Sequence, residues 1–411
     1  MNTSQASIAA AVIVAVERRW GRYQHRMAVG NASLGRPDRA LAHAQQATAH
    51  LDRAGTDTVE LGTAFDTLAG CYQQLGQLDA ATQARRRAVD VLELAAPHST
   101  EWVAALVKLG DLYRLQGDYE QAERVLREAV EEAAGTPSHI DEMPLRAAAL
   151  NAVGIVYKDT GRYDAAGAAY GAALQLVSAA TGPQHPCAAA LWHNLAGLAH
   201  AQGHPHHAAT LAARAGRLHE RQLGPNHHLV AQDLAVLGAT LLDQGHVDKA
   251  EELFERTLTI FRRRHPADQY EVAVNLSNLA ACSVARGDSA NAERLLRQGL
   301  TIRRAILGPD HPETARQLNN LAVAIAQQHR TDEATDLYRQ ALSILEHTLP
   351  ANHPLTAICR TNAADAQART ANSDHDVRHH TAVLQRDPRR SGVPSSPIGP
   401  DQTRPPARRH R

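Results

Sequence analysis

The feature that most constrains the fold of this chain is a repeat of about 42 residues. It is clearest at a small residue that follows a large apolar one, as in Leu321-Ala322. These small residues, called anchors below, are Ala28, Ala69, Gly110, Gly154, Ala196, Gly238, Ala280, Ala322 and Ala364, at intervals of 41, 41, 44, 42, 42, 42, 42 and 42 residues. Repetition at such a period is typical of a solenoid, in which each unit contacts only its neighbours. A chain of 411 residues can therefore fold without one very large core.

Each repeat has the pattern of two helices joined by a tight turn. In residues 312–328, Leu318, Leu321 and Ile325 recur at helical spacing on one face, and a second helix is expected to begin near Asp332. A hairpin this thin cannot bury both of its faces alone, so it needs neighbours of the same kind.

The turn between the two helices is marked by a glycine seven residues after the anchor. These glycines are Gly35, Gly76, Gly117, Gly161, Gly203, Gly245 and Gly287. Glycine adopts the left-handed conformation that ends a helix without steric cost. In the eighth repeat His329 takes this place, and we expect it to adopt the same conformation. Five residues later a small residue is expected where the two helices cross: Ala40, Ala81, Ala122, Ala166, Ala208, Ala250, Ala292 and Ala334.

Composition and charge agree with an all-α fold and exclude several classes of function. Aromatic residues make up only 4% of the chain, whereas a sheet protein favours aromatic and β-branched residues. Acidic and basic residues balance at 43 each, which argues against nucleic acid as the ligand of the whole chain. The apolar run 6–16 is too short to span a bilayer, which needs about 20 residues, and it lacks the preceding basic residues of a secretory signal. We therefore expect a cytoplasmic protein that is not embedded in a membrane.

These patterns divide the chain into three parts. Residues 1–20 are expected to form a helix that caps the open end of the first repeat, because terminal repeats need such a cover. Residues 21–371 hold eight full hairpins and a ninth first helix. Residues 372–411 are rich in proline and arginine, carry a charge of about +4 and lack apolar periodicity, so a disordered tail is expected there.

The order of large residue, Leu-Gly or Leu-Ala, Tyr, Gly and Ala resembles the tetratricopeptide repeat. The links between repeats add detail, since they read GPQHP at 182–186, GPDHP at 308–312 and PANHP at 350–354. With LSNLA at 276–280 and LNNLA at 318–322, they resemble the kinesin-light-chain subfamily of these repeats. The resemblance implies a right-handed superhelical solenoid whose concave groove binds short peptide segments. The long heptad coiled coil of the motor-binding family members is absent, which argues against a motor role.

In tetratricopeptide superhelices the first helix of each repeat lines the concave groove, and this fixes the candidate site residues. Asparagine recurs two or three positions before the anchor, at Asn151, Asn194, Asn278, Asn319, Asn320 and Asn362. Its amide can pair with the backbone of an extended peptide, or it can bond across neighbouring helices and fix the superhelix. The cationic candidates are Lys108, Arg114, Lys158 and Arg316, which would favour an acidic ligand.

The function expected from the repeat pattern and the family resemblance is that of a scaffold or adaptor, which binds a protein or peptide partner in the groove. The alternatives are a bacterial regulator whose superhelix closes on a signal peptide, and a detached sensor module of a signalling ATPase. No phosphate loop, nucleophile elbow or HExxH motif is present, so no catalytic residue, cofactor or enzymatic activity is predicted. No metal site is predicted either, because the histidines of the links recur once per repeat and are therefore interpreted as architectural.

Overall fold

The computed structural model describes residues 3–34, 36–55, 58–135, 143–182, 185–263, 268–351 and 353–371. These residues form 17 α-helices and no β-strand. The first helices of the hairpins are α1 (Thr3–Ser33), α3 (Val59–Gln74), α5 (Thr100–Leu115), α7 (Met143–Asp159), α9 (Pro186–Ala201), α11 (His228–Asp243), α13 (Gln269–Ala285), α15 (Pro312–Ala326) and α17 (Pro354–Ala371). The second helices are α2 (Pro37–Arg53), α4 (Leu78–Ala95), α6 (Tyr119–Gly135), α8 (Tyr163–Thr181), α10 (Pro205–Leu223), α12 (Val247–Arg262), α14 (Ser289–Leu307) and α16 (Thr331–Thr348).

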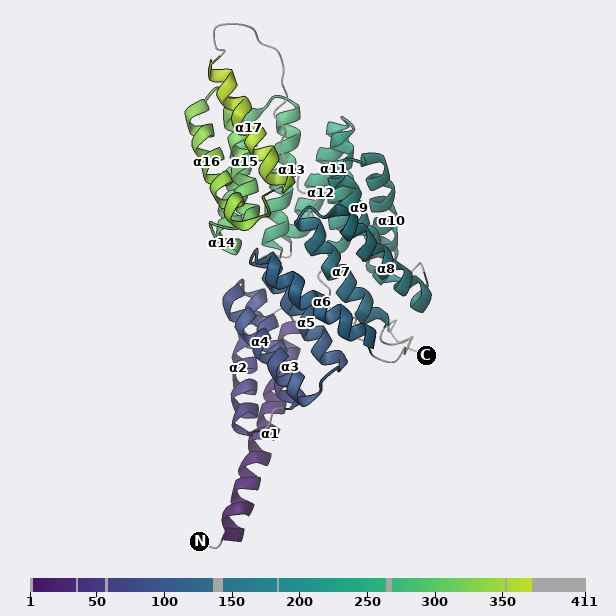
Figure 1. The fold of residues 1–411 in the computed structure, drawn as a ribbon, viewed down its shortest axis with the longest axis vertical. Coiled ribbons are helices and arrows are strands. Elements are labelled where there is room, and N and C mark those ends of the chain that lie inside the picture. Colours follow the sequence, from purple (N-terminus) through teal and green to yellow (C-terminus); the bar gives the residue numbers. More distant parts are fainter. Residues whose placement is uncertain are drawn as a thin grey trace, which may run out of the picture.

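The hairpins stack into the all-α, right-handed superhelical solenoid that the repeat predicts (Figure 1). Each helix packs on the next helix of the chain, and successive first helices such as α5 and α7 also contact each other. The first helices therefore form the inner, concave layer and the second helices the outer layer.

The residues that the repeat singled out occupy the expected places. The eight alanines of the helix crossing, from Ala40 to Ala334, are all fully buried. The six turn glycines from Gly76 to Gly287 have φ between +74° and +81°, and His329 has φ +63°, as predicted. Gly35 lies outside the described residues, as does the predicted disordered tail 372–411.

Two glycine anchors lie very close to a large side chain of the second helix. A Cβ on Gly110 would lie 2.3 Å from Leu126 Cγ, and a Cβ on Gly154 would lie 2.6 Å from the Tyr170 ring. Real Cβ atoms do not approach that closely, so glycine is required at these two anchors. Where the facing residue is small, as with Ala28 opposite Ala44, alanine fits and both residues are fully buried.

The N-terminal segment differs from the expected arrangement. Residues 1–20 were expected as a separate capping helix, but α1 runs without a break from Thr3 to Ser33 and becomes the first helix of the first hairpin. Gly21, at the expected boundary, is a packing residue: a Cβ there would lie 2.6 Å from Leu51 Cγ on α2. The N-terminal half of α1 extends beyond the other helices (Figure 1).

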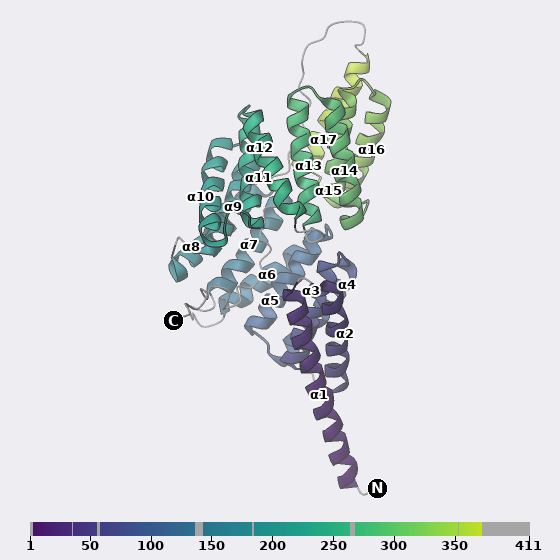
Figure 2. The ribbon, with the colours of Figure 1, turned by 180° about the vertical axis from the view of Figure 1, so that it is seen from behind.

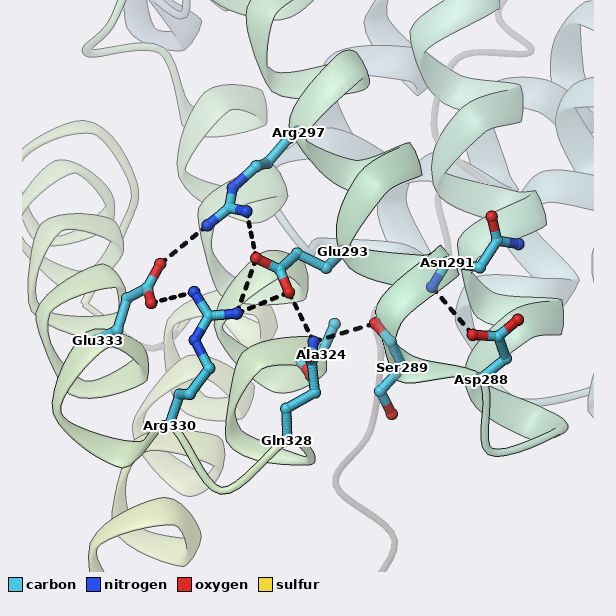
Figure 3. Close-up of polar contacts among 9 residues, drawn as sticks. All are labelled: Asp288, Ser289, Asn291, Glu293, Arg297, Ala324, Gln328, Arg330 and Glu333. Atoms are coloured by element: carbon cyan, nitrogen blue, oxygen red, sulfur yellow. Dashed lines mark hydrogen bonds and ion pairs between the residues drawn. The ribbon is translucent and has the colours of Figure 1, made fainter.

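Polar contacts join the turn of one hairpin to the second helix of the preceding hairpin. Figure 3 shows the contact between the seventh and eighth hairpins, where Glu293 on α14 accepts hydrogen bonds from Gln328 (2.7 Å) and from Arg330 (2.8 and 3.0 Å). Arg297 pairs with both Glu293 and Glu333. Burial raises the pKa of the Glu293 carboxyl, but the bonds from Gln328 and Arg330 outweigh burial, and the net shift is downward. The carboxylate is therefore held ionised at the junction.

Candidate functional site: the concave face

All ten residues predicted for the groove lie on first helices, and these helices form the concave face. Lys108 and Arg114 are on α5, and Asn151 and Lys158 are on α7. The others are Asn194 on α9, Asn278 on α13, Arg316, Asn319 and Asn320 on α15, and Asn362 on α17. The structure thus places the predicted residues on one layer of the solenoid.

The asparagines of this layer are buried and bond to one another across neighbouring helices. Asn194 Nδ2 donates to Asn151 Oδ1 over 2.6 Å, which joins α9 to α7. Asn362 Nδ2 donates to Asn319 Oδ1 over 3.1 Å, which joins α17 to α15 in the same way. All six predicted asparagines are at most 6% exposed. The cross-helix pairing expected as one of their two roles is therefore present at two junctions, and contact with a ligand remains a prediction.

Two asparagine oxygens of this face are buried without a hydrogen-bond partner among the described residues. They are Asn194 Oδ1 and Asn278 Oδ1, and the two side chains are 0% and 1% exposed. A buried polar atom without a partner carries a free-energy cost of about 1–3 kcal/mol. The concave face therefore retains acceptors that a donor such as a backbone N–H of a bound peptide could satisfy.

Three of the four predicted cations are paired with carboxylates. Lys108 Nζ lies 2.7 Å from Asp66 Oδ2, Arg114 Nη1 lies 3.4 Å from Asp159 Oδ2, and Arg316 pairs with Glu313 three residues earlier on α15. Lys158 is fully buried. Burial opposes the charge of Arg114, yet the carboxylates of Asp159 and Asp111 raise its pKa overall. The concave face thus presents compensated charge rather than an open cationic surface.

A second charged group surrounds Glu313. Its Oε2 atom accepts from Arg303 Nη1 (2.8 Å) on α14 and from the Tyr270 hydroxyl (3.0 Å) on α13. The Arg303 guanidinium also lies over the Tyr270 ring, 5.3 Å from its centre. Tyr270 contributes to the raised pKa of Arg114, so the two residues lie near each other although they belong to the seventh and third hairpins. The superhelix is tightly wound at this point.

Direct contacts close the superhelix between hairpins far apart in the sequence. His353 Nδ1 accepts from Leu355 N (3.0 Å), so its Nε2 carries the proton and donates to the Asp159 carbonyl (2.9 Å). Gly161 lies in the turn two residues after Asp159, and a Cβ on it would lie 2.8 Å from Pro354 Cδ. Gly117 and Pro312 each lie one repeat before Gly161 and Pro354, and they form the corresponding pair. A Cβ on Gly117 would lie 3.2 Å from Pro312 Cδ. We call the contact of Asp159, Gly161 and Gly117 with His353, Pro354 and Pro312 the closure contact. Figures 1 and 2 show the C-terminal hairpins beside α5 to α7.

The closure contact uses the link histidines, which were interpreted as architectural. His185, His227, His311 and His353 are the N-cap residues of α9, α11, α15 and α17, and each accepts a backbone N–H at its Nδ1 atom. The architectural interpretation is confirmed for these four. The additional contacts of His311 and His353 at the closure contact were not foreseen, because nothing in a 42-residue unit indicates which distant unit it meets.

A buried network in the fifth and sixth hairpins was also missed by the sequence analysis. Asp233 on α11 accepts from His193 Nδ1 (2.6 Å) on α9 and from His219 Nδ1 (2.7 Å) on α10, and all three side chains are at most 2% exposed. Burial lowers the pKa of His193, against the opposing effect of the Asp233 carboxylate. His193 lies three residues before the anchor Ala196. Asparagine occupies this position in two other repeats, so the sequence did mark position 193 as one where a buried polar side chain could be expected.

The cysteines, which could in principle bind a metal ion or react as thiols, are mostly buried. Cys71, Cys282 and Cys359 are buried and Cys187 is partly buried, all as free thiols, and burial raises the pKa of Cys282 and of Cys359 to about 12. In the described residues no three His, Cys, Asp or Glu side chains gather as a metal-ion site requires. No helix in that part of the chain has both the length and the hydropathy to cross a membrane.

Comparison with protein families identifies the repeat. A tetratricopeptide repeat model matches residues 68–133, 145–216 and 271–347, and a second tetratricopeptide repeat model matches residues 234–269. Among curated proteins, none matches the sequence.

Solved structures with similar folds include repeat proteins from several organisms. BtubC (BKLC) from P. vanneervenii is 25% identical over 57% of this chain and 92% of its own, with a TM-score of 0.42. A protein of kinesin-light-chain type with nearly identical TPR-like repeats from P. anserina is 22% identical over 52% of this chain and 99% of its own, with a TM-score of 0.37. A signal transduction ATPase of the STAND type with a tetratricopeptide repeat sensor, from Pyrococcus horikoshii, is 11% identical over 82% of this chain and 49% of its own, with a TM-score of 0.47.

Proposed function

Because the chain belongs to the tetratricopeptide repeat family, we propose that it is a protein-interaction scaffold that binds an extended peptide segment of a partner on its concave face. The observation that carries this proposal is the row of buried asparagines on the first helices, which includes acceptors without partners at Asn194 and Asn278. An extended peptide offers a backbone N–H at regular intervals along its length, and such donors could satisfy these two acceptors.

Binding in this way requires the superhelix to open. The asparagines are buried in the closed structure, and the closure contact holds the third and fourth hairpins against the eighth hairpin and α17. A ligand that binds only the open form shifts the population toward that form. Its apparent affinity is then reduced by the small open fraction of the free protein.

The charges of the concave face support recognition of backbone more than of acidic side chains. Lys108, Arg114 and Arg316 already have carboxylate partners, so an acidic ligand would have to displace Asp66, Asp159 or Glu313. Apolar groove positions are also covered in the closed form, as Val107 and Val323 are 2% and 0% exposed. On opening, these side chains would provide pockets that select the sequence of the peptide.

The first test uses linear peptides selected from a random display library, with the full chain as bait. Asn278, Asn320 and Asn362 are changed to alanine together, and the dissociation constant of a selected peptide is measured by fluorescence anisotropy. Loss of three hydrogen bonds predicts affinity weaker by on the order of 10- to 100-fold. The matched control is Asn291→Ala on the outer helix α14, which should leave affinity unchanged.

Circular dichroism of the triple variant shows whether it remains folded. Unchanged affinity in a folded triple variant would remove the asparagine row from the binding site. If the control weakens binding as much as the triple variant does, the peptide binds elsewhere on the solenoid.

A regulator that changes shape on binding is the second candidate, and the closure contact is the observation that favours it. A scaffold with an open groove would hardly change shape, whereas opening of this closed superhelix would convey the binding event to a partner protein. Small-angle scattering with and without the selected peptide distinguishes the two. A larger radius of gyration with peptide favours the regulator, and an unchanged one favours the static scaffold.

A further inference from the structure

On the protruding part of α1 an apolar stripe is about half exposed to solvent. Val12, Ile13, Val16, Trp20 and Tyr23 are 56%, 61%, 50%, 51% and 45% exposed, and they follow one another at helical spacing. Single exposed apolar residues are common on protein surfaces, but a contiguous apolar patch usually marks an interaction site. In Figures 1 and 2 this part of α1 stands away from the other helices.

The repeat register shows what kind of partner this stripe fits. Trp20 and Tyr23 lie eight and five residues before the anchor Ala28. The equivalent residues of the second hairpin, Leu61 and Ala64, are 2% and 0% exposed. They cluster with Ala47 and Leu51 of α2, the second helix of the preceding hairpin.

The third hairpin has the same arrangement. Trp102 and Ala105 are 4% and 1% exposed. Trp20 and Tyr23 therefore lie on the stacking face of the solenoid, and Val12, Ile13 and Val16 continue the stripe toward the N-terminus of α1. At the second and third hairpins this face is covered by the antiparallel second helix of the preceding hairpin.

We propose that a second copy of this chain covers this face, through antiparallel packing of its own α1 in a two-fold symmetric dimer. Successive helices of a hairpin solenoid run antiparallel, so an antiparallel α1 pair repeats the packing found at the other junctions. A two-fold axis makes such a contact self-complementary, since each copy supplies the same stripe.

The distribution of charge on α1 favours this direction. Residues 3–16 contain no charged side chain, whereas Glu17 and the three arginines Arg18, Arg19 and Arg22 follow. An antiparallel pair lays the uncharged turns of one helix beside the arginines of the other. A parallel pair would bring the arginines of the two copies together, and like charges at that separation repel.

The sizes of the side chains favour the same direction. In an antiparallel pair centred on Val16, Trp20 of one copy meets Val12 and Ile13 of the other, so a large ring faces smaller aliphatic residues. The Trp20 ring is already oriented, because it stacks on His50 of α2 with centres 6.5 Å apart and meets Tyr23 edge-on at 5.8 Å. Little side-chain freedom is then lost on association.

The part of the chain outside the described residues does not offer a better cover. The sequence of residues 372–411 contains six prolines and no helical apolar repeat, a pattern that does not match the amphipathic helix expected on this face. This proposal does not depend on the peptide-binding function, since the stripe is on the N-terminal helix and the asparagine row begins at α7.

The mass of the full chain in solution tests the proposal. Sedimentation equilibrium should show a shift from 44.4 kDa to twice that mass as the concentration rises. Val16→Glu places a charge at the centre of the contact and should weaken dimerisation by about tenfold or more. Leu94→Glu is the matched control, because Leu94 on α4 is 74% exposed and lies outside the stripe.

A wild-type chain that stays monomeric over the whole range would overturn the proposal. It would also be overturned if Val16→Glu dimerised as tightly as wild type with the same helix content by circular dichroism. Binding of a monomer to anionic lipid vesicles, abolished by Val16→Glu, would assign the stripe to a lipid surface and likewise exclude the dimer.

Disulfide cross-linking tests the direction of the helices. Trp20→Cys mixed with Val12→Cys should form a covalent dimer, and Trp20→Cys alone should not, because positions 12 and 20 meet only in the antiparallel pair centred on Val16. Cross-linking of Trp20→Cys with itself would overturn the antiparallel arrangement. The native cysteines interfere little, since Cys71, Cys282 and Cys359 are buried.

Discussion

At the scale of single residues, the most unusual feature is the buried carboxylate of Asp233 between two imidazoles. His193 and His219 come from different helices, and both donate through Nδ1. Asp233 therefore joins α9, α10 and α11 with two hydrogen bonds in the interior. Breaking one of these bonds leaves a buried charge short of a partner, which costs about 1–3 kcal/mol.

His193 should make the stability of the chain depend on pH in the weakly acidic range. Burial, together with His219 and Lys158, lowers its pKa, while Asp233 opposes the shift, so the imidazole is neutral in the fold. Its unfolded pKa is about 6.5. Below that pH the unfolded chain binds a proton that the folded chain does not, and the free energy of unfolding falls. The loss approaches about 1.4 kcal/mol per pH unit for this group until the pH reaches the folded pKa.

Urea denaturation at pH 7.5, 6.5 and 5.5 measures this effect. His193→Gln should lower stability at pH 7.5 by about 1–3 kcal/mol and make the decrease toward pH 5.5 shallower than in wild type. His207→Gln, at an exposed histidine of the neighbouring turn, should follow the wild-type decrease. Equal slopes in wild type and His193→Gln would mean that other groups govern the acid sensitivity.

At the scale of helices and hairpins, the polar contact at Glu293 recurs along the solenoid. Arg162 bonds to Glu123 between the third and fourth hairpins, at the register that Arg330 and Glu293 occupy between the seventh and eighth. At the junction of the fourth and fifth hairpins, Gly167 occupies the repeat position of these glutamates. A cavity of about 390 Å³ lies beside it, between α8, α9 and α10. At this junction no glutamate side chain fills the space beside residue 167.

Removal of the Glu293 carboxylate should loosen the eighth hairpin from the seventh. Glu293→Ala leaves Arg330 and Gln328 without their shared acceptor, so we expect a lower thermal midpoint, by about 2 °C. Faster hydrogen exchange should appear in α16. The matched control is Asp336→Asn, which breaks the exposed Asp336–Arg339 pair within α16 and links no two hairpins. A control as destabilised as Glu293→Ala would show that surface charge alone matters here.

The hairpins themselves could be predicted from the sequence because each depends on a local pattern. Anchors, crossing alanines and turn glycines act within one 42-residue unit, and His329 was assigned a left-handed conformation for the same reason. The continuity of α1 could not be predicted in this way, since Gly21 is placed by contact with Leu51 of the next helix. A glycine that marks a turn and one that makes room for a neighbour look alike in the sequence.

At the scale of the whole molecule, the closure contact lay beyond sequence analysis. The curvature of a solenoid is the sum of small rotations at each junction. No single repeat therefore indicates that the Asp159 carbonyl meets His353, 194 residues later. The candidate site residues lie on the first helices as expected because the helix assignment is local, whereas their pairing across neighbouring hairpins depends on how the hairpins stack.

Whether the closure contact controls access to the concave face can be tested at one glycine with an internal control. Gly161 and Gly203 occupy the same turn position with the same φ of +78°. A Cβ on Gly161 would lie 2.8 Å from Pro354, whereas nothing lies within 4 Å of one on Gly203. Alanine should therefore strain the backbone equally at both sites, by about 1 kcal/mol, and disturb the closure contact only at position 161.

Gly161→Ala should increase the radius of gyration measured by small-angle scattering, while Gly203→Ala should match wild type. It should also bind a selected peptide more tightly than Gly203→Ala does, because a larger fraction of the free protein is already open. Expansion without tighter binding would separate the closure contact from the binding site. Identical scattering from both variants would mean that the packing of neighbouring hairpins alone, without His353 and Pro354, sets the curvature of the superhelix.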